Sequence, residues 1–138
     1  MTVADQVVDG LLAAGIEPLM VVWGSPRWAN GSDDRAVVPT EEAAFASWLE
    51  RYRAFARVLA THYQGRVDHW ELWNEPNISA FWKPNPNIDS YARWAVAVEA
   101  ELRRANPAAK VAYGSVTVPE VGYESPGHIA GRDFVRGL

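Results

Sequence analysis

The sequence predicts an α/β protein built on a parallel sheet of three strands. Stretches with helical periodicity alternate with short apolar stretches, in the order helix, strand, helix, strand, helix, strand and the start of another helix. Alternation of this kind joins parallel strands through helical crossovers. The first apolar stretch, residues 19–22, has no polar position, which predicts a strand covered on both faces. No linker or internal repeat divides residues 1–138, so we expect them to lie in one domain.

The first helix is predicted to start after Thr2, because Thr2 and Asp5 form a variant of the capping box and apolar residues follow at helical spacing. Gly15 stands where a glycine commonly ends a helix. The first strand should then run over residues 16–23. Residues 24–39 show no periodicity and contain several glycines and prolines, which predicts a long loop of the kind that is usually functional.

Thr40 is predicted to cap the second helix, whose apolar stripe includes Trp48 and which Gly65 ends. The second strand should cover residues 67–73. A third helix is predicted over Ile88–Ala105, with Trp94 on its core face. The third strand should cover residues 110–118, and a final helix should begin at residue 132 after a loop rich in glycine and proline.

The second predicted strand leads into the most informative stretch of the chain. Residues 70–77 read Trp-Glu-Leu-Trp-Asn-Glu-Pro-Asn, so that Glu75 enters a loop directly after an apolar strand, with Asn74 before it and Pro76 after it. The proline biases Glu75 towards an extended or turn conformation. An acid held beside aromatic surface can donate a proton to a glycosidic oxygen. The stretch therefore predicts a site for sugar chemistry.

This octapeptide resembles the fourth-strand signature of the clan A glycoside hydrolases, which are (β/α)8 enzymes that cleave glycosides with retention. The continuation to Phe81-Trp82 is most similar to the xylosidase/iduronidase-like family 39 and its cellulase-like relatives. The resemblance implies that Glu75 is the general acid/base, that Asn74 binds the sugar 2-hydroxyl, and that no cofactor is needed. It also implies that the chain supplies the third to fifth strands of a TIM barrel, which has eight strands in about 250 residues.

The seven tryptophans support a carbohydrate site by their placement. Four of them fall at predicted strand ends or in the loops that follow, where aromatic rings can stack on sugars. The Ser-Pro-Arg-Trp at residues 25–28 is similar to the loop after the third strand of the clan. Alternatively, these rings only cap the barrel. The candidate substrate-binding residues are Trp23, Trp28, Trp73, Trp82 and Asn77.

Hydrolysis with retention needs a second carboxylate about 5.5 Å from the acid, and inversion needs one up to about 9.5 Å away. Glu71 nominally shares a strand face with Trp73 and Glu75 but lies about 13 Å from Glu75 along the strand, so we expect it to have a structural partner. Glu120 and Glu124 match no motif of the clan. The clan's nucleophile ends the seventh strand, so the chain should carry the acid/base without the nucleophile and be inactive alone.

Two alternatives remain open: a non-catalytic carbohydrate-binding protein, and a half-barrel that self-associates. Both the enzyme and the binding protein would have a carbohydrate as partner. This partner is predicted to be an oligosaccharide, a polysaccharide or a glycoside. A net charge of −4 without long charge runs argues against nucleic acid, and no apolar run approaches the roughly 20 residues of a membrane span. The three histidines lack metal-ligand spacing. The first residues are expected to form an amphipathic helix and not a signal peptide. Relatives in the clan are often secreted, and the sequence itself predicts no localisation.

Overall fold

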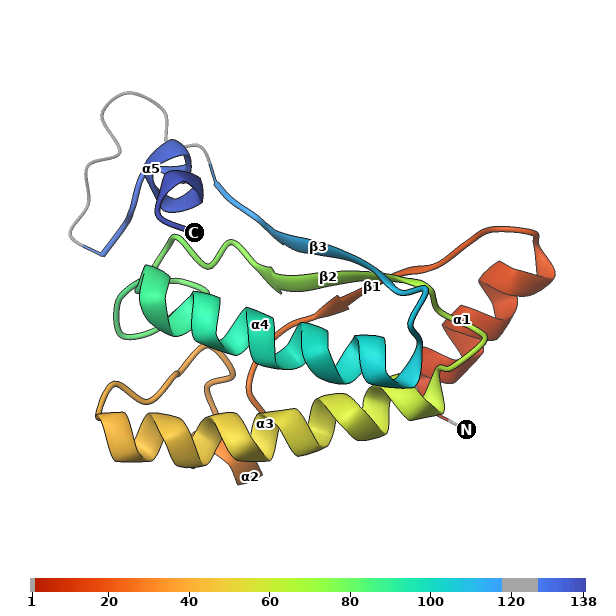
Figure 1. Cartoon of the computed structure of the whole chain (residues 1–138), viewed down its shortest axis with the longest axis horizontal. Coiled ribbons are helices and arrows are strands. Elements are labelled where there is room, and N and C mark those ends of the chain that lie inside the picture. The colour runs from red at the N-terminus through yellow and green to blue at the C-terminus, as the bar shows by residue number, and fades with distance from the viewer. Residues whose placement is uncertain (1, 118–126) are drawn as a thin grey trace.

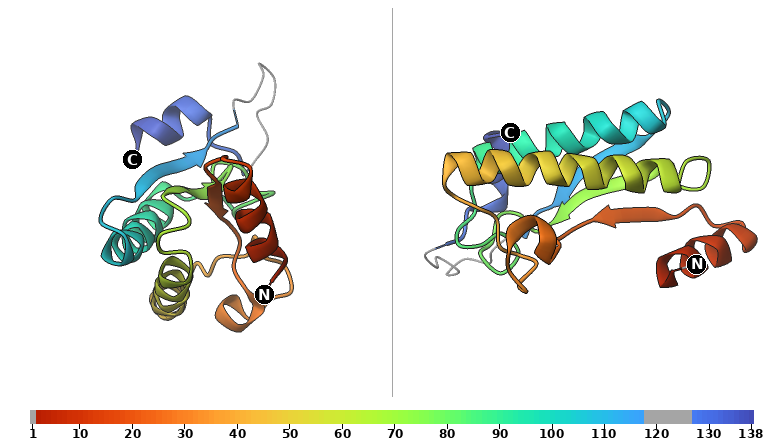
Figure 2. Two further views of the ribbon diagram at one scale, coloured as in Figure 1. Left: turned by 90° about the vertical axis from the view of Figure 1, so that its right-hand side faces the viewer. Right: turned by 90° about the horizontal axis from the view of Figure 1, so that it is seen from below.

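A computed structural model of the chain describes residues 2–117 and 127–138. Strands β1 (Leu19–Val22), β2 (His69–Asn74) and β3 (Lys110–Ser115) form a parallel sheet in the order β1-β2-β3. Helices α3 (Glu42–His62) and α4 (Ile88–Ala105) lie side by side against one face of this sheet (Figures 1 and 2). The prediction of an α/β protein with three parallel strands is confirmed.

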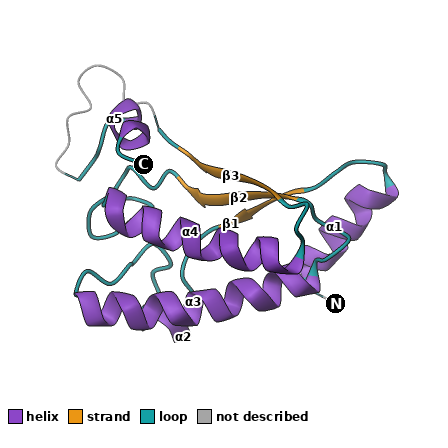
Figure 3. Cartoon of the chain, in the orientation of Figure 1, coloured by secondary structure: helices purple, strands orange, loops and turns teal. Residues whose placement is uncertain are grey.

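Three shorter helices complete the described fold (Figure 3). Helix α1 (Val3–Ala13) starts at the predicted capping box, in which the Asp5 N–H donates to the Thr2 hydroxyl at 3.2 Å and the Thr2 N–H donates to the Asp5 carboxylate at 2.8 Å. Gly15 follows this helix with a φ of 72°, as the glycine signal predicts. Helices α2 (Arg27–Asn30) and α5 (Gly131–Arg136) lie near the carboxyl ends of the strands.

Several predicted boundaries are wrong. Strand β1 starts at Leu19 rather than at residue 16, and β2 covers His69–Asn74 rather than residues 67–73. The segment 24–39 is not entirely a loop, because α2 forms one helical turn inside it. Glu41 rather than Thr40 caps α3, since the Glu41 carboxylate accepts hydrogen bonds from the N–H groups of Ala43 and Ala44. Strand β3 ends at Ser115 rather than at residue 118.

The core lies between the sheet and the pair α3 and α4. Trp48 and Trp94 are 1% and 0% exposed, which confirms that these two tryptophans belong to the core. Burying a large apolar side chain contributes about 1.5–3 kcal/mol, so this aromatic layer is a main source of stability. The carboxylate of Glu101 is also buried, and Arg57 holds it from α3 with a hydrogen bond of 2.9 Å that lowers its pKa. The helix pair is thus joined by apolar packing and by an ion pair whose carboxylate is buried and whose arginine is half exposed.

The opposite face of the sheet is open in the described structure. Leu19 and Val21 alternate along β1 with half-buried Met20 and buried Val22, and they are 57% and 45% exposed. The prediction that this strand is covered on both faces is therefore wrong for the described residues, because α3 and α4 pack against one face alone (Figure 1).

Candidate active site

The candidate acid, Glu75, lies directly after the carboxyl end of the central strand. Its N–H donates to the carbonyl oxygen of Ser115 at 2.9 Å, which ties it to the end of β3. Its carboxylate accepts a hydrogen bond from the hydroxyl of Thr117, two residues beyond β3. Glu75 is half-buried and has a φ of 45°, a left-handed conformation that is uncommon outside glycine. The neighbouring strand therefore holds both the backbone and the carboxylate of this residue.

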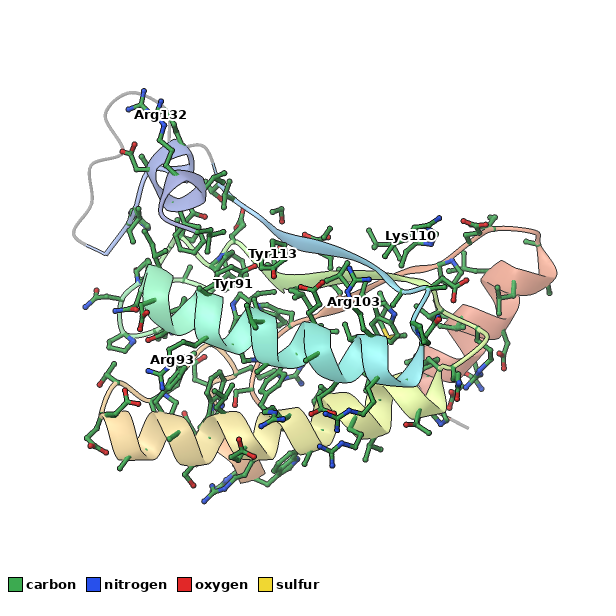
Figure 4. All side chains as sticks on the ribbon, in the orientation of Figure 1. Tyr91, Arg93, Arg103, Lys110, Tyr113 and Arg132 are labelled. Atoms are coloured by element: carbon green, nitrogen blue, oxygen red, sulfur yellow. The ribbon has the colours of Figure 1, made fainter. Side chains whose placement is uncertain are left out.

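The pairing between β2 and β3 is interrupted just before the acid. The register skips Trp73, whose φ is 71°. The hydroxyl of Tyr91, which lies between α4 and the sheet (Figure 4), donates to the Leu72 carbonyl at 2.9 Å and accepts from the Gly114 N–H at 2.8 Å. A Cβ on Gly114 would lie 2.4 Å from the Leu72 carbonyl oxygen, so a glycine is required here. A helix side chain thus satisfies the backbone where the strand turns towards the site.

Trp73 and Trp82 are buried, at 0% and 2% exposed, which corrects the prediction that their rings shape sugar subsites. The positive φ of Trp73 turns its ring towards the helices, away from the face that carries Glu71. There it packs at 5.0 Å between ring centroids against both Trp82 and Trp94, and its Nε1 donates to the Phe81 carbonyl at 2.8 Å. These rings support the site from within the core and are not accessible to a ligand.

Asn77, another predicted sugar-binding residue, is fully buried and joins two loops. Its Nδ2 donates to the carbonyls of Thr117 at 2.8 Å and Ile129 at 2.9 Å, and its Oδ1 accepts from the Thr117 N–H at 3.0 Å. Its prediction as a sugar ligand is thereby corrected, because backbone groups occupy its amide. Asn77 instead fixes Thr117, whose hydroxyl binds the carboxylate of Glu75.

Asn74 and Trp23 line a shallow groove of about 380 Å³ together with Val21 and Phe81. Trp23 is 37% exposed and meets Phe81 edge to face, with ring centroids 5.8 Å apart. Asn74 is half-buried and immediately precedes Glu75. An amide, an acid and an exposed indole are groups that can bind sugar hydroxyls and a C–H face. The structure therefore brings Asn74 and Trp23 together in one groove, and Glu75 follows Asn74 in the chain at the same end of the sheet.

Trp28 lies on α2 and is 57% exposed. Its ring contacts Phe55 of α3 edge to face, at 6.4 Å between centroids. It lines a separate pocket of about 450 Å³, which shares Trp23 with the groove beside Asn74. Of the four tryptophans predicted at the site, Trp23 and Trp28 are thus the two with exposed rings.

Glu71 has the structural partner that the sequence led us to expect. Its carboxylate accepts a hydrogen bond of 2.9 Å from the N–H of Ser115, the residue whose carbonyl binds the Glu75 N–H. Ser115 thereby links the two glutamates through its backbone. Glu120 and Glu124, the other carboxylates considered, lie outside the described residues.

Sequence reasoning missed Thr117 and Tyr91. The carboxyl ends of parallel strands meet at one edge of a sheet, so a hydroxyl residue after the third strand was a usable signal for Thr117. Nothing in the sequence separates Tyr91 from the other aromatic residues of its helix stripe. Within residues 2–117 and 127–138, no cluster of histidine and acidic side chains could hold a metal ion, and no helix is long and apolar enough to cross a membrane.

Comparisons with known proteins relate this chain to glycosidases. The sequence matches no protein-family model. It is 28% identical over 121 residues to a β-xylosidase from Caldicellulosiruptor saccharolyticus, a match that covers 78% of this chain and 25% of that protein. The chain therefore spans about a quarter of the length of this curated relative.

Two solved structures share the fold. A monomeric β-xylosidase from Caulobacter crescentus CB15 superposes with a TM-score of 0.64 at 23% identity, covering 78% of this chain and 23% of that one. A glucosidase from Croceicoccus marinus superposes with a TM-score of 0.66 at 16% identity, covering 97% of this chain and 26% of that one. The three parallel strands and their helices thus correspond to part of a TIM barrel, and the sequence similarity relates the chain to glycoside hydrolases.

Proposed function

We propose that residues 1–138 are part of the catalytic domain of a retaining O-glycosyl hydrolase that acts on β-linked sugars. The observation that carries this proposal is the hold on Glu75, which β3 fixes through the Ser115 carbonyl and the Thr117 hydroxyl beside Asn74 and an open groove. The octapeptide of clan A and the similarity to a β-xylosidase support the same assignment. Among the families of the clan, the continuation to Phe81 favours family 39.

In the proposed reaction Glu75 protonates the glycosidic oxygen as its bond to the anomeric carbon breaks, while a second carboxylate attacks that carbon. Glu75 then accepts a proton from the water that hydrolyses the glycosyl-enzyme. Asn74 binds the 2-hydroxyl of the sugar. The resemblance assigns the nucleophile to a later strand of the barrel, so the whole protein catalyses the reaction and these 138 residues alone do not.

Replacing Glu75 by alanine in the full-length protein tests the assignment. Loss of a general acid should slow glycosides with poor leaving groups by about 10²- to 10⁴-fold, because these need protonation of the leaving oxygen. Aryl glycosides with acidic phenols should be slowed far less in the step that breaks their bond. The measurement is kcat/KM for both substrate classes.

Glu71→Gln is the matched control, because Glu71 lies on the same strand and binds the backbone of Ser115. It should change both substrate classes by one factor. Equal slowing of both classes in Glu75→Ala, or no slowing, would show that Glu75 is not the acid/base.

A second candidate function is non-catalytic carbohydrate binding, which the exposed rings of Trp23 and Trp28 favour. Calorimetry with xylo- and gluco-oligosaccharides distinguishes the two functions. Binding without turnover by the full-length protein would support the binding protein. A third, a self-associating half-barrel, is favoured by the open face with Leu19 and Val21, and predicts a stable dimer of the 138 residues in light scattering.

A further inference from the structure

The pocket beside Trp28 takes no part in the reaction proposed above. It has a volume of about 450 Å³, within the range of about 300–1,000 Å³ that small-molecule sites occupy. It shares Trp23 with the groove that Asn74 lines, so a chain of sugars bound in the groove could extend into it. Its lining combines aromatic and charged side chains, among them Trp28, Phe55, Arg27, Asp33 and Arg35.

Helix α3 holds the floor of this pocket in place. The Tyr52 hydroxyl donates to the Gly24 carbonyl at 3.0 Å, and the Trp48 Nε1 donates to the Ser25 hydroxyl at 2.8 Å. Both donors are buried core residues of α3. The Ser25 N–H in turn donates to the Arg35 carbonyl at 2.7 Å, which brings Arg35 back beside the end of β1. The backbone of Arg35 is therefore preorganised and does not depend on a bound ligand.

The guanidinium of Arg35 is distinctive among the cations of the chain. The sequence has 13 lysines and arginines, and Arg35 is the one whose side chain has neither a hydrogen bond nor an ion pair with any part of the chain that the structure describes. Even Arg51 donates to a carbonyl, that of Ala29, at 3.2 Å. An exposed arginine with a fixed backbone and a free guanidinium is available to bind an external anion.

The remaining charges of the pocket favour an anion. Arg27 and Asp33 form an ion pair of 2.9 Å at the rim, with side chains 74% and 81% exposed. This pair neutralises itself, which leaves the pocket with the positive charge of Arg35 in a chain whose net charge is −4. Guanidinium binds carboxylates through two parallel hydrogen bonds, and an indole face packs against the C–H face of a sugar. Arg35 and Trp28 together provide both interactions.

We propose that this pocket binds a uronic acid residue of the substrate, with its carboxylate on Arg35 and its ring against Trp28. The proposal rests on the glycosidase function above and deepens it. The uronic acid is a neighbour of the sugar whose bond is cleaved and does not occupy the cleavage position. The protein would then act preferentially on oligosaccharides that carry acidic side groups.

The test is calorimetry on the full-length protein carrying Glu75→Gln, which keeps the ligand intact if the proposed function holds. The probes are a xylo-oligosaccharide with a glucuronic acid branch, its neutral counterpart, and the neutral chain with a sulfate ester. Arg35→Gln should weaken binding of the uronic acid probe about tenfold, since hydrogen bonds to charged groups are the stronger kind, and should leave the neutral probe within about twofold. Trp28→Ala should weaken both probes.

Arg136→Gln provides the matched control, because it removes the same charge from an exposed position on α5. It should leave both affinities unchanged. The proposal is overturned if Arg35→Gln affects both probes equally or neither, if Arg136→Gln matches it, or if the sulfated probe binds as tightly as the uronic acid. The two proposals can fail separately. If Arg35→Gln selectively weakens binding of the uronic acid probe but the unmodified protein hydrolyses no glycoside, this inference stands and the proposed function is overturned.

Discussion

The two ends of the sheet hold their charged residues in different ways. At the amino end, Asp5 of α1 lies 2.6 Å from His62 of α3, and Arg66 binds Asp9 at 2.9 Å. At the carboxyl end, the acid Glu75 is held by a hydroxyl and a backbone carbonyl, with no ion pair to any described residue. Ion pairs therefore hold Asp5 and Asp9 at the amino end. At the carboxyl end ion pairs such as Arg27–Asp33 also occur, but neutral groups hold Glu75.

The ion pairs at the amino end contribute to stability, whereas Glu75 at the carboxyl end is the residue proposed to act in catalysis. The amino-end pairs join α1 to the end of α3, and each charged group there has a group of opposite charge as its partner. In the proposed reaction Glu75 exchanges a proton, and neutral groups suit that role because a fixed cation favours the ionised form of a carboxylate. In TIM barrels the site is built at the carboxyl ends of the strands, and Glu75 lies at that end of the sheet.

The largest effect on the carboxyl end should come from Tyr91→Phe. The change keeps the ring in the core but leaves the Leu72 carbonyl and the Gly114 N–H without the hydroxyl that binds them. Leaving buried polar groups unpaired costs about 1–3 kcal/mol, which urea-induced unfolding of the full-length protein would measure.

Tyr113→Phe is the control for this variant. Tyr113 is 41% exposed and its hydroxyl donates to the Glu99 carboxylate at 2.8 Å at the surface, so its loss should change the free energy of unfolding by less than about 0.5 kcal/mol. If both variants lost the same stability, the hydroxyl of Tyr91 would have no special part in ordering the strand end.

A smaller, pH-dependent effect is expected at the amino end. The Thr2 N–H, followed by His62, holds the pKa of Asp5 well below its usual range. Arg66 lies 3.4 Å from the same carboxylate and also pairs with Asp9. A depressed pKa contributes stability above the unfolded pKa of about 3.9, and this contribution is lost as the pH falls through the folded pKa.

The difference in urea midpoint between the unmodified protein and Asp5→Asn should therefore be largest near pH 6 and shrink below about pH 4. Asp33→Asn, which removes a carboxylate from an exposed pair, should show little difference at either pH. A difference for Asp5→Asn that stayed constant down to pH 2 would contradict the role of its charge.

The smallest expected change in stability concerns the cap of α3, where Glu41 is the observed cap and Thr40 the predicted one. Glu41→Ala removes the acceptor of the Ala43 and Ala44 N–H groups and should cost about 1 kcal/mol. Thr40→Ala should be close to neutral, because Thr40 does not cap the helix. Thermal unfolding of the two variants checks the pair, and the reverse order would restore Thr40 as the cap.

Much of the fold could be predicted because it depends on local patterns. Helical spacing of apolar residues marked α3 and α4, and the Thr2 capping box marked α1. The cap of α3 could not be predicted, because threonine is the better capping type, whereas in the structure the Glu41 carboxylate accepts the hydrogen bonds of the first helix N–H groups. The prediction that β1 is covered on both faces was also wrong, because an apolar strand sequence does not specify what packs against each face.

The candidate site was predictable in part for the same reason. The octapeptide located Glu75 and Asn74 at a strand end, and loop position marked Trp23 and Trp28. The amide of Asn77 looks the same in the sequence whether it binds a sugar or, as here, three backbone groups.

The sequence by itself determined the order of elements, the parallel sheet and the position of the acid, because periodicity and strand ends are local properties of the chain. Tertiary structure alone decided which groups hold that acid. Trp73 turns into the core at the point where the Tyr91 hydroxyl binds the Leu72 carbonyl, and Thr117 reaches Glu75 because β3 lies next to β2. These contacts join residues 19 and 42 positions apart, and only the packing of a helix and a neighbouring strand brings them together.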